Sequence, residues 1–218
     1  MAELILFDLD GTLTDSGPGI INCVKYAFEK LNFTDYDEET LRSFVGPPLS
    51  YRFQEVLQCS EEEALHAVAL YRERYTDTGI WENSVYEGIP EVLTLLRCAG
   101  KKLAVATSKP QAMAERVLER FELSEYFDVI CGSKADGKKA EKTEILREVL
   151  AASGFEDRKD QVLLIGDTKY DVLGAKAVGI DCVGVSYGYG TSEELEESGA
   201  VKVVNTAGEL VYIALDEE

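Results

Sequence analysis

The stretch that decides the fold is Leu4-Ile5-Leu6-Phe7-Asp8-Leu9-Asp10-Gly11-Thr12, an apolar run that ends in two acidic residues and a turn. Short, continuously apolar runs are typical of buried parallel strands. Similar runs recur along the chain, each followed by a polar or glycine-containing turn: Leu103–Ala106, Val129–Cys131, Val162–Ile165, Cys182–Val185 and Val201–Val204. Their alternation with helical patterns, from about residue 88 to the end, predicts an α/β fold with a doubly wound parallel sheet.

The segment from about residue 16 to residue 86 interrupts this alternation. It has helical periodicity and no convincing strand, as in the series Ile20, Ile21, Val24, Phe28 and Leu31. We therefore expect an α/β core domain at residues 1–15 and 87–218, with a helical domain inserted at residues 16–86.

Composition limits the partners. Acidic residues outnumber basic ones 41 to 22, and the resulting net charge of -19 repels nucleic-acid polymers and anionic membranes. We expect neither as a partner, and a monomer or weak homodimer. The five cysteines are odd in number with no C-x-x-C pair, and no apolar run approaches the length of a signal or membrane segment, so we expect a cytoplasmic protein.

The first predicted strand ends in Asp8 and Asp10. Because side chains alternate along a strand, both carboxylates project to the same side, and such crowding raises one pKa unless a cation is nearby. A metal ion on Asp8 would leave one ionised nucleophile and one carboxyl group, that of Asp10, able to carry a proton. The alternative is an ordinary polar turn that closes a strand.

Polar residues also follow the later strands. Thr107 and Ser108 offer hydroxyl and N–H groups that suit phosphate oxygens, although the same pattern begins many helices. Asp167 and Asp171 lie four residues apart, so both face one spot if a helix begins between them. Oxygen ligands of this kind suit Mg²⁺ rather than zinc.

A cation is expected near the nucleophile to neutralise it and an incoming phosphate. Three lysines precede or open the helical pattern after the third core strand, namely Lys138, Lys139 and Lys142. We expect one of them to be functional and favour Lys142.

These motifs, in this order, resemble those of the haloacid dehalogenase-like phosphohydrolases, and the resemblance covers the whole chain. It implies a Rossmann-like core in which Asp8 is the nucleophile and a Mg²⁺ ligand. Asp10 would be the acid and then the base, and would offer its backbone carbonyl to the metal. The resemblance also implies that Thr107 contacts the phosphoryl group and that Lys142 binds both this group and the nucleophile. Asp167 would be a Mg²⁺ ligand, and Asp171 would bind the ion directly or through water.

The helical insertion resembles this family's small cap, which selects the substrate. The phrases at residues 86–90 and 106–110 are similar to the phosphoglycolate phosphatase and 5'-nucleotidase branch, so the resemblance implies a phosphatase acting on a small phosphorylated metabolite. Phosphoglycolate is the first expectation and nucleoside monophosphates are the alternative. Another alternative is a β-phosphoglucomutase-like mutase, for which Arg52 in the insertion would be a second phosphate-binding group.

Overall fold

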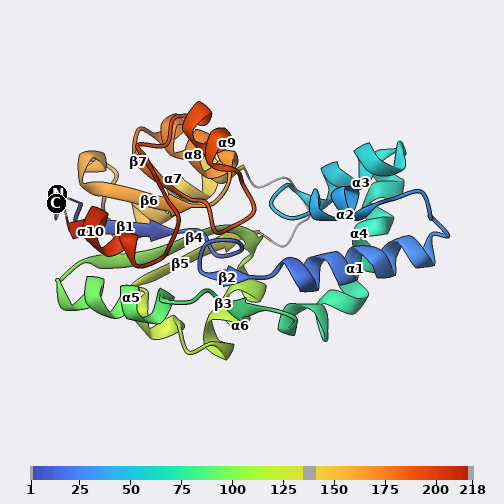
Figure 1. Cartoon of the computed structure of the whole chain (residues 1–218), viewed down its shortest axis with the longest axis horizontal. Coiled ribbons are helices and arrows are strands. Elements are labelled where there is room, and N and C mark those ends of the chain that lie inside the picture. Colours follow the sequence, from blue (N-terminus) through green and yellow to red (C-terminus); the bar gives the residue numbers. More distant parts are fainter. Residues whose placement is uncertain (1, 135–140, 216–218) are drawn as a thin grey trace. The chain divides into compact units, whose positions relative to one another are not determined.

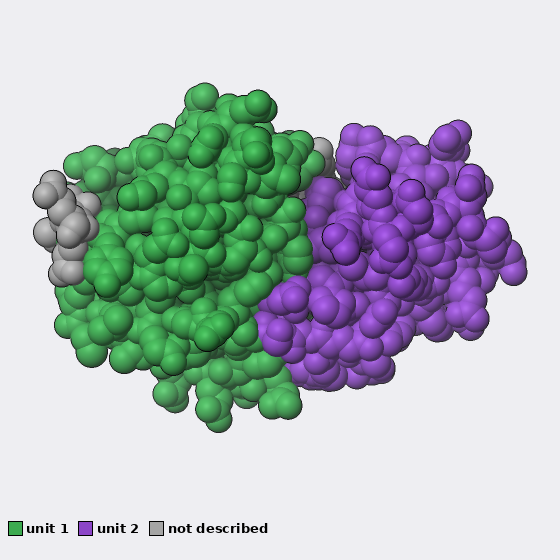
Figure 2. Space-filling view, in the orientation of Figure 1, with its two compact units in different colours: residues 1–14, 85–218 green, residues 15–84 purple. Residues whose placement is uncertain are grey.

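A computed structural model of the protein describes residues 2–134 and 141–215 (Figure 1). The chain divides into two compact units, coloured separately in Figure 2. Unit 1 comprises residues 1–14 and 85–218, and unit 2 comprises residues 15–84. The boundaries expected from the sequence differ from these by one or two residues.

Unit 1 is built on a six-stranded sheet in the order β5-β4-β1-β6-β7-β8. Every neighbouring pair in it is parallel. The predicted α/β fold with a doubly wound parallel sheet is therefore confirmed. The strands are β1 (Leu4–Phe7), β4 (Lys102–Pro110), β5 (Val129–Ser133), β6 (Val162–Gly166), β7 (Asp181–Val185) and β8 (Lys202–Val204).

Helices cover both faces of this sheet (Figure 1). Helices α7, α8 and α9 lie on one face, and α5 and α6 lie on the other, with α10 packed beside α5. Glycines with left-handed backbone conformation end α7 and α8 at Gly154 and Gly179, which is how many helices stop. The helices are α5 (Ile89–Cys98), α6 (Gln111–Arg120), α7 (Lys142–Ser153), α8 (Lys169–Val178), α9 (Ser192–Ser198) and α10 (Glu209–Leu215).

The strand β1 lies at the centre of the sheet, between β4 and β6. All four of its residues are buried, because helices cover both of its faces. This explains why the sequence shows a continuous apolar run here instead of an alternating one. The buried side of α7 and α8 packs on the same strands to form one hydrophobic core.

Unit 2 is helical, with α1 (Gly17–Lys30), α2 (Glu38–Arg42), α3 (Leu49–Leu57) and α4 (Glu61–Tyr75). Its core contains a group of aromatic rings around Phe28, whose ring centroid lies 4.9 Å from that of Phe33 and 5.7 Å from that of Phe44. Aromatic pairs at such separations add to the stability gained from burial. The first turn of α4 is closed by a capping box between Ser60 and Glu63.

The expectation of no strand in residues 16–86 is wrong at one point. A two-stranded sheet pairs β2 (Thr14–Asp15) with β3 (Ser84–Val85), where the chain passes from one unit to the other. Strands of two residues are too short to produce a side-chain periodicity in the sequence. Among the described helices, none has the length and apolar character needed to span a bilayer. All five cysteines are free thiols.

Candidate active site

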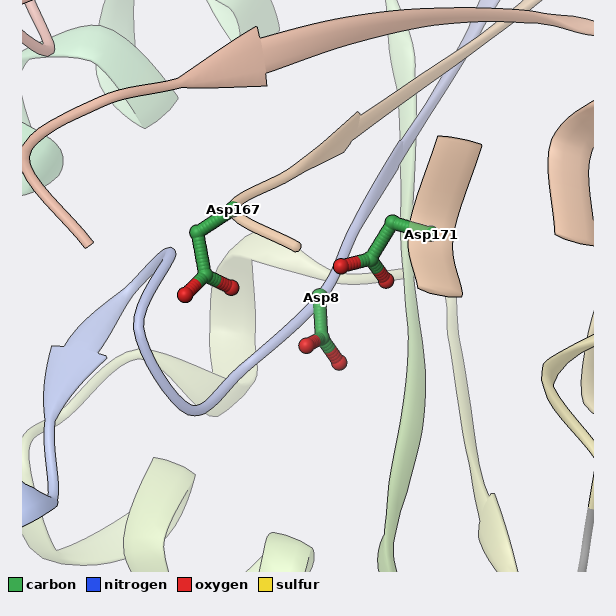
Figure 3. Close-up of side chains that lie close together, drawn as sticks. All are labelled: Asp8, Asp167 and Asp171. Carbon is green, nitrogen blue, oxygen red and sulfur yellow. The ribbon is translucent and has the colours of Figure 1, made fainter. Parts of the chain in front are cut away.

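Three acidic side chains converge at the carboxyl ends of two neighbouring strands. Asp8 follows β1, Asp167 follows β6, and Asp171 lies in the first turn of α8. One carboxylate oxygen from each lies within 4.8 Å of the other two, and Figure 3 shows the three side chains pointing toward a common space. The parallel pairing of β1 with β6 causes this meeting, because it brings the ends of both strands to the same edge.

Asp171 is fixed by the start of its own helix. Its Oδ2 accepts hydrogen bonds from the backbone N–H of Thr168 at 3.0 Å and from the hydroxyl of Thr168 at 2.8 Å. This capping arrangement holds the carboxylate against the first turn of α8. The other oxygen, Oδ1, is left to face the site, where it lies 2.6 Å from Nζ of Lys142.

Lys142 is the first residue of α7, and its side chain is buried. Its Nζ lies 2.9 Å from Oδ1 of Asp8 as well as next to Asp171. Burial by itself would lower the pKa of a lysine, but the two carboxylates outweigh it and raise the pKa of Lys142. The ammonium group is therefore a permanent cation in the site. Lys138 and Lys139, the other lysines considered for this role, lie outside the described residues.

Asp167 is held on both of its oxygens. Oδ1 accepts a hydrogen bond from the hydroxyl of Thr12 at 3.2 Å, and Oδ2 accepts one from the backbone N–H of Tyr189 at 2.9 Å. Tyr189 belongs to a loop of residues 186–190 after β7, which packs closely on the site. A Cβ added at Gly188 would overlap the backbone oxygen of Gly11 and the side chain of Asp167. The loop therefore needs glycine to approach the acidic cluster so closely.

The electrostatics of the cluster are unfavourable without a further cation. Burial, partly offset by Lys142, raises the pKa of Asp8 from 3.8 to about 6. Burial and the neighbouring carboxylates of Asp171 and Asp8 raise the pKa of Asp167 well above its usual value. Three clustered carboxylates, two of them buried and that of Asp8 partly buried, share the site with one ammonium group, so ionising all of them leaves an excess of negative charge. Only oxygen atoms are offered, and these residues therefore fit a hard divalent metal ion.

The end of β4 supplies the next predicted residues. Thr107 is buried, and its hydroxyl oxygen accepts a hydrogen bond from the backbone N–H of Lys109 at 3.2 Å. This contact uses an acceptor position and leaves the hydroxyl hydrogen available to donate. Phe7 of β1 pairs with Val105 of β4, so Thr107 lies close to the strand end that carries Asp8. Ser108 points to solvent.

Sequence reasoning missed the partner of Asp10. The Nζ of Lys109 lies 2.9 Å from both Oδ1 and Oδ2 of Asp10, in a contact that buries the lysine side chain. The sequence signal that could have found it is the spacing of two residues between Thr107 and Lys109, because residues two apart on a strand project to the same side. The structure shows that β4 does continue this far, to Pro110. We had expected this strand to end at Ala106.

The structure thus brings Asp8, Lys142, Asp167 and Asp171 together, and joins Asp10 to Lys109. Arg52 lies in unit 2, on α3. Its guanidinium group pairs with Glu55 at 2.6 Å and donates to the hydroxyl of Ser43 at 2.8 Å. Its role as a second phosphate-binding group stays a prediction.

Known proteins share both the sequence pattern and the fold. The haloacid dehalogenase-like hydrolase family matches residues 5–185. The chain belongs to this family. The membership predicted from the strand-end motifs is confirmed, and the enzyme is a phosphatase of the haloacid dehalogenase-like type.

The chain is similar to several proteins that are named for an activity. The chain is 42% identical to a 5'-nucleotidase of Pseudomonas aeruginosa, over 88% of this chain and 86% of that one. It is 36% identical to the tyrosine-protein kinase PtkA of Mycobacterium tuberculosis, over 94% and 69%. It is 30% identical to a phosphoglycolate phosphatase of Colwellia psychrerythraea, over 96% and 95%. The crystal structure of a predicted phosphatase from Clostridium acetobutylicum superimposes with a TM-score of 0.93 at 41% identity, covering 99% of each chain.

Proposed function

We propose that this enzyme is a Mg²⁺-dependent phosphomonoester hydrolase that forms a covalent aspartyl-phosphate on Asp8. The observation that supports this most directly is the convergence of Asp8, Asp167 and Asp171, since two of these carboxylates, Asp8 and Asp171, also contact the buried ammonium group of Lys142. A nucleophilic carboxylate needs nearby positive charge to accept a phosphate dianion. Lys142 supplies one positive charge in this site, and the excess of carboxylates over lysine would be balanced by a bound divalent metal ion.

In the first step, a carboxylate oxygen of Asp8 attacks phosphorus. The bond from phosphorus to the ester oxygen breaks, and the carboxyl group of Asp10 gives its proton to the departing alcohol. Lys142 and the hydroxyl of Thr107 would contact the phosphoryl oxygens and stabilise the charge on them. The predicted contact from Ser108 would be made by its backbone N–H group or its hydroxyl.

In the second step, Asp10 accepts a proton from water while the water oxygen attacks phosphorus. The bond between phosphorus and Asp8 breaks, which releases inorganic phosphate and returns the free carboxylate. Asp10 therefore regains the proton it lost in the first step, and the cycle balances. Both steps need Asp10 to lie within hydrogen-bonding reach of the reacting oxygen.

The residues that would hold Mg²⁺ are Asp8, Asp167 and Asp171, together with the backbone carbonyl of Asp10. When bound, a divalent ion supplies positive charge that stabilises the phosphoryl oxygens. Asp171 would act through water, because Thr168 and Lys142 already engage its two oxygens. Reversible loss of activity on chelation, restored by Mg²⁺, tests this assignment.

The substrate we propose is a small phosphorylated metabolite, with unit 2 serving as the family's cap and selecting it. We place nucleoside 5'-monophosphates ahead of phosphoglycolate, the first expectation from sequence, because the identity to a 5'-nucleotidase is 42% whereas that to a phosphoglycolate phosphatase is 30%. Measuring phosphate release from nucleoside monophosphates, phosphoglycolate and sugar phosphates tests this order of substrate preference. Release from none of them would reject the proposed hydrolysis of small phosphorylated metabolites. The cytoplasmic location stays a prediction.

A further inference from the structure

Lys109 and Asp10 form an ion pair that the proposed reaction does not yet account for. The side chain of Lys109 is only 4% exposed and that of Asp10 is 20% exposed, so the pair is largely shielded from water. The ammonium nitrogen contacts both carboxylate oxygens at 2.9 Å. Lysines are seldom buried unless they are paired, and burying an ammonium group without a partner is costly. The pairing therefore fixes where both side chains lie.

This ion pair is separate from the contacts around the nucleophile. Lys142 contacts Asp8 and Asp171, whereas Lys109 contacts Asp10. The two lysines come from different elements, α7 and β4. Asp8 and Asp10, the two carboxylates with a chemical role in the reaction, therefore each contact a different buried lysine. Lys142 has a role in the proposed reaction, whereas Lys109 has none so far.

We infer that Lys109 is a positioning residue of the phosphatase reaction, which holds the carboxyl group of Asp10 in the orientation needed for proton transfer. The inference rests on the proposed function, in which Asp10 exchanges a proton with the ester oxygen and then with water. The backbone on either side of Asp10 is already constrained, because Asp10 forms a bridge with Thr14. The remaining freedom is rotation of the side chain, and the contact with Lys109 removes it.

The two-oxygen contact is compatible with both protonation states of Asp10. One oxygen can continue to accept from the ammonium group while the other carries or receives the transferred proton. Lys109 keeps its own proton throughout, so the balance of the reaction is unchanged. The backbone N–H of Lys109 also donates to the hydroxyl of Thr107, so one residue orients both a proton carrier and a predicted phosphate contact. A general acid must lie about 3 Å from its target, which makes such orientation valuable.

The leaving group distinguishes this role from a purely structural one. An alkyl phosphate needs the proton from Asp10 because an alkoxide is a poor leaving group, whereas p-nitrophenolate departs without it. The ratio kcat/KM reports the first step, in which the leaving group departs, whereas kcat also includes the second step, in which Asp10 acts for every substrate. We expect Lys109→Met to lower kcat/KM for an alkyl phosphomonoester by roughly 10- to 100-fold, because a misplaced general acid loses part of the roughly 10²- to 10⁴-fold that a well-placed one contributes. The kcat/KM for p-nitrophenyl phosphate should fall much less, and Lys109→Arg should recover most of the activity.

A double-mutant cycle with Asp10→Ala tests whether Lys109 acts through Asp10. In the Asp10→Ala background, Lys109→Met should cause no further loss of kcat for p-nitrophenyl phosphate. The matched control is Lys101→Met, which removes another buried lysine, one that donates to the backbone oxygen of Ala2. This control should leave the leaving-group dependence unchanged. A crystal structure of Lys109→Met should show Asp10 in a different side-chain rotamer.

Equal losses of kcat/KM for both leaving groups, or an undiminished loss of kcat in the Asp10→Ala background, would overturn the inference. If Lys109→Met lowers Tm so far that it does not fold, the same comparison is made with Lys109→Gln. Phosphate release by the unmodified enzyme is measured first. Its absence would reject the proposed function, whereas normal release with independent mutational effects would reject the positioning role alone.

Discussion

The ammonium nitrogen of Lys142 lies 2.9 Å from the nearest carboxylate oxygen of Asp8. The first residue of α7 and the residue after β1 are thereby joined in the buried part of the site. The same lysine also contacts Oδ1 of Asp171, at 2.6 Å. The consequences of this arrangement can be measured residue by residue.

Replacement of the nucleophile should abolish turnover and preserve the fold. Asp8→Asn keeps the size of the side chain but removes the charged oxygen that attacks phosphorus, so we expect kcat for p-nitrophenyl phosphate to fall on the order of 10⁴-fold or more. Circular dichroism should show an unchanged fold. The control is Asp157→Asn at an exposed position of unit 1, which should retain full activity. Substantial turnover by Asp8→Asn would end the assignment of the nucleophile.

Removal of the buried cation should affect both stability and activity. Lys142→Met leaves Asp8 and Asp171 without their shared partner, and breaking a buried ion pair in this way costs about 3–5 kcal/mol of unfolding free energy. We expect kcat to fall by roughly 10²- to 10³-fold, as when one preorganised donor is lost. Lys176→Met, at an exposed position of α8, is the control for loss of a lysine.

The double variant Lys142→Met with Asp8→Asn separates charge from packing. If the instability of Lys142→Met comes from carboxylates left without a cation, removing one of those charges should restore part of the lost Tm. Additive losses of Tm would indicate instead that the methylene groups of Lys142 matter through their packing.

Stability should depend on pH and Mg²⁺ together. Because burial raises the pKa of Asp8 from 3.8 to about 6, the folded metal-free protein binds more protons than the unfolded chain between these values. Its unfolding free energy therefore falls as the pH rises through that range. The raised pKa of Asp167 acts in the same direction.

Mg²⁺ bound to the ionised carboxylates would relieve this cost, so it should raise Tm more at about pH 7.5 than at about pH 5. Thermal unfolding with EDTA and with excess Mg²⁺ measures the difference in Tm between the two samples at each pH. Titratable groups far from the site affect both samples equally, so their contributions cancel in this difference. An equal rise in Tm at both values would contradict the prediction, and so would no rise at either.

The loop after β7 should control affinity for the metal. A methyl group at Gly188 would overlap the backbone oxygen of Gly11 and the side chain of Asp167, so Gly188→Ala should displace a predicted metal ligand. We expect Mg²⁺ affinity to fall by roughly 10- to 100-fold, as happens when the groups that orient a ligand are disturbed. The control is Gly208→Ala, where a methyl group meets no atom within 4 Å. Equal Mg²⁺ affinities by titration calorimetry would refute the role of the loop.

Much of unit 1 could be predicted from its apolar runs. Leu4–Phe7 is β1 in full, because a strand buried on both faces has to be apolar at every position. The end of β4 could not be found in this way. That strand continues through Thr107 and Lys109 to Pro110, and polar residues at a strand end produce no hydrophobic signal.

The acidic residues of the site were predictable because they follow directly on strands whose ends must meet. Lysines are harder to predict, since a long, flexible side chain can bring its charge several ångströms from its own backbone. Lys142 was favoured because a cation was needed after β5, and a specific contact to Asp8 could not be read from spacing. Lys109 was missed because its strand was expected to stop earlier. Only the three-dimensional arrangement shows that its ammonium group contacts Asp10.

The central place of β1 in the sheet has a consequence for how the protein is made. Both hydrogen-bonding edges of this strand are filled by strands synthesised much later, β4 on one side and β6 on the other. The ribosome therefore releases the nucleophile's strand long before its neighbours exist, and such long-range pairing slows folding. A nascent chain that stops before β6 lacks Asp167 and one of the two strands that pair with β1, so catalytic competence can arise only after Asp167 has been synthesised.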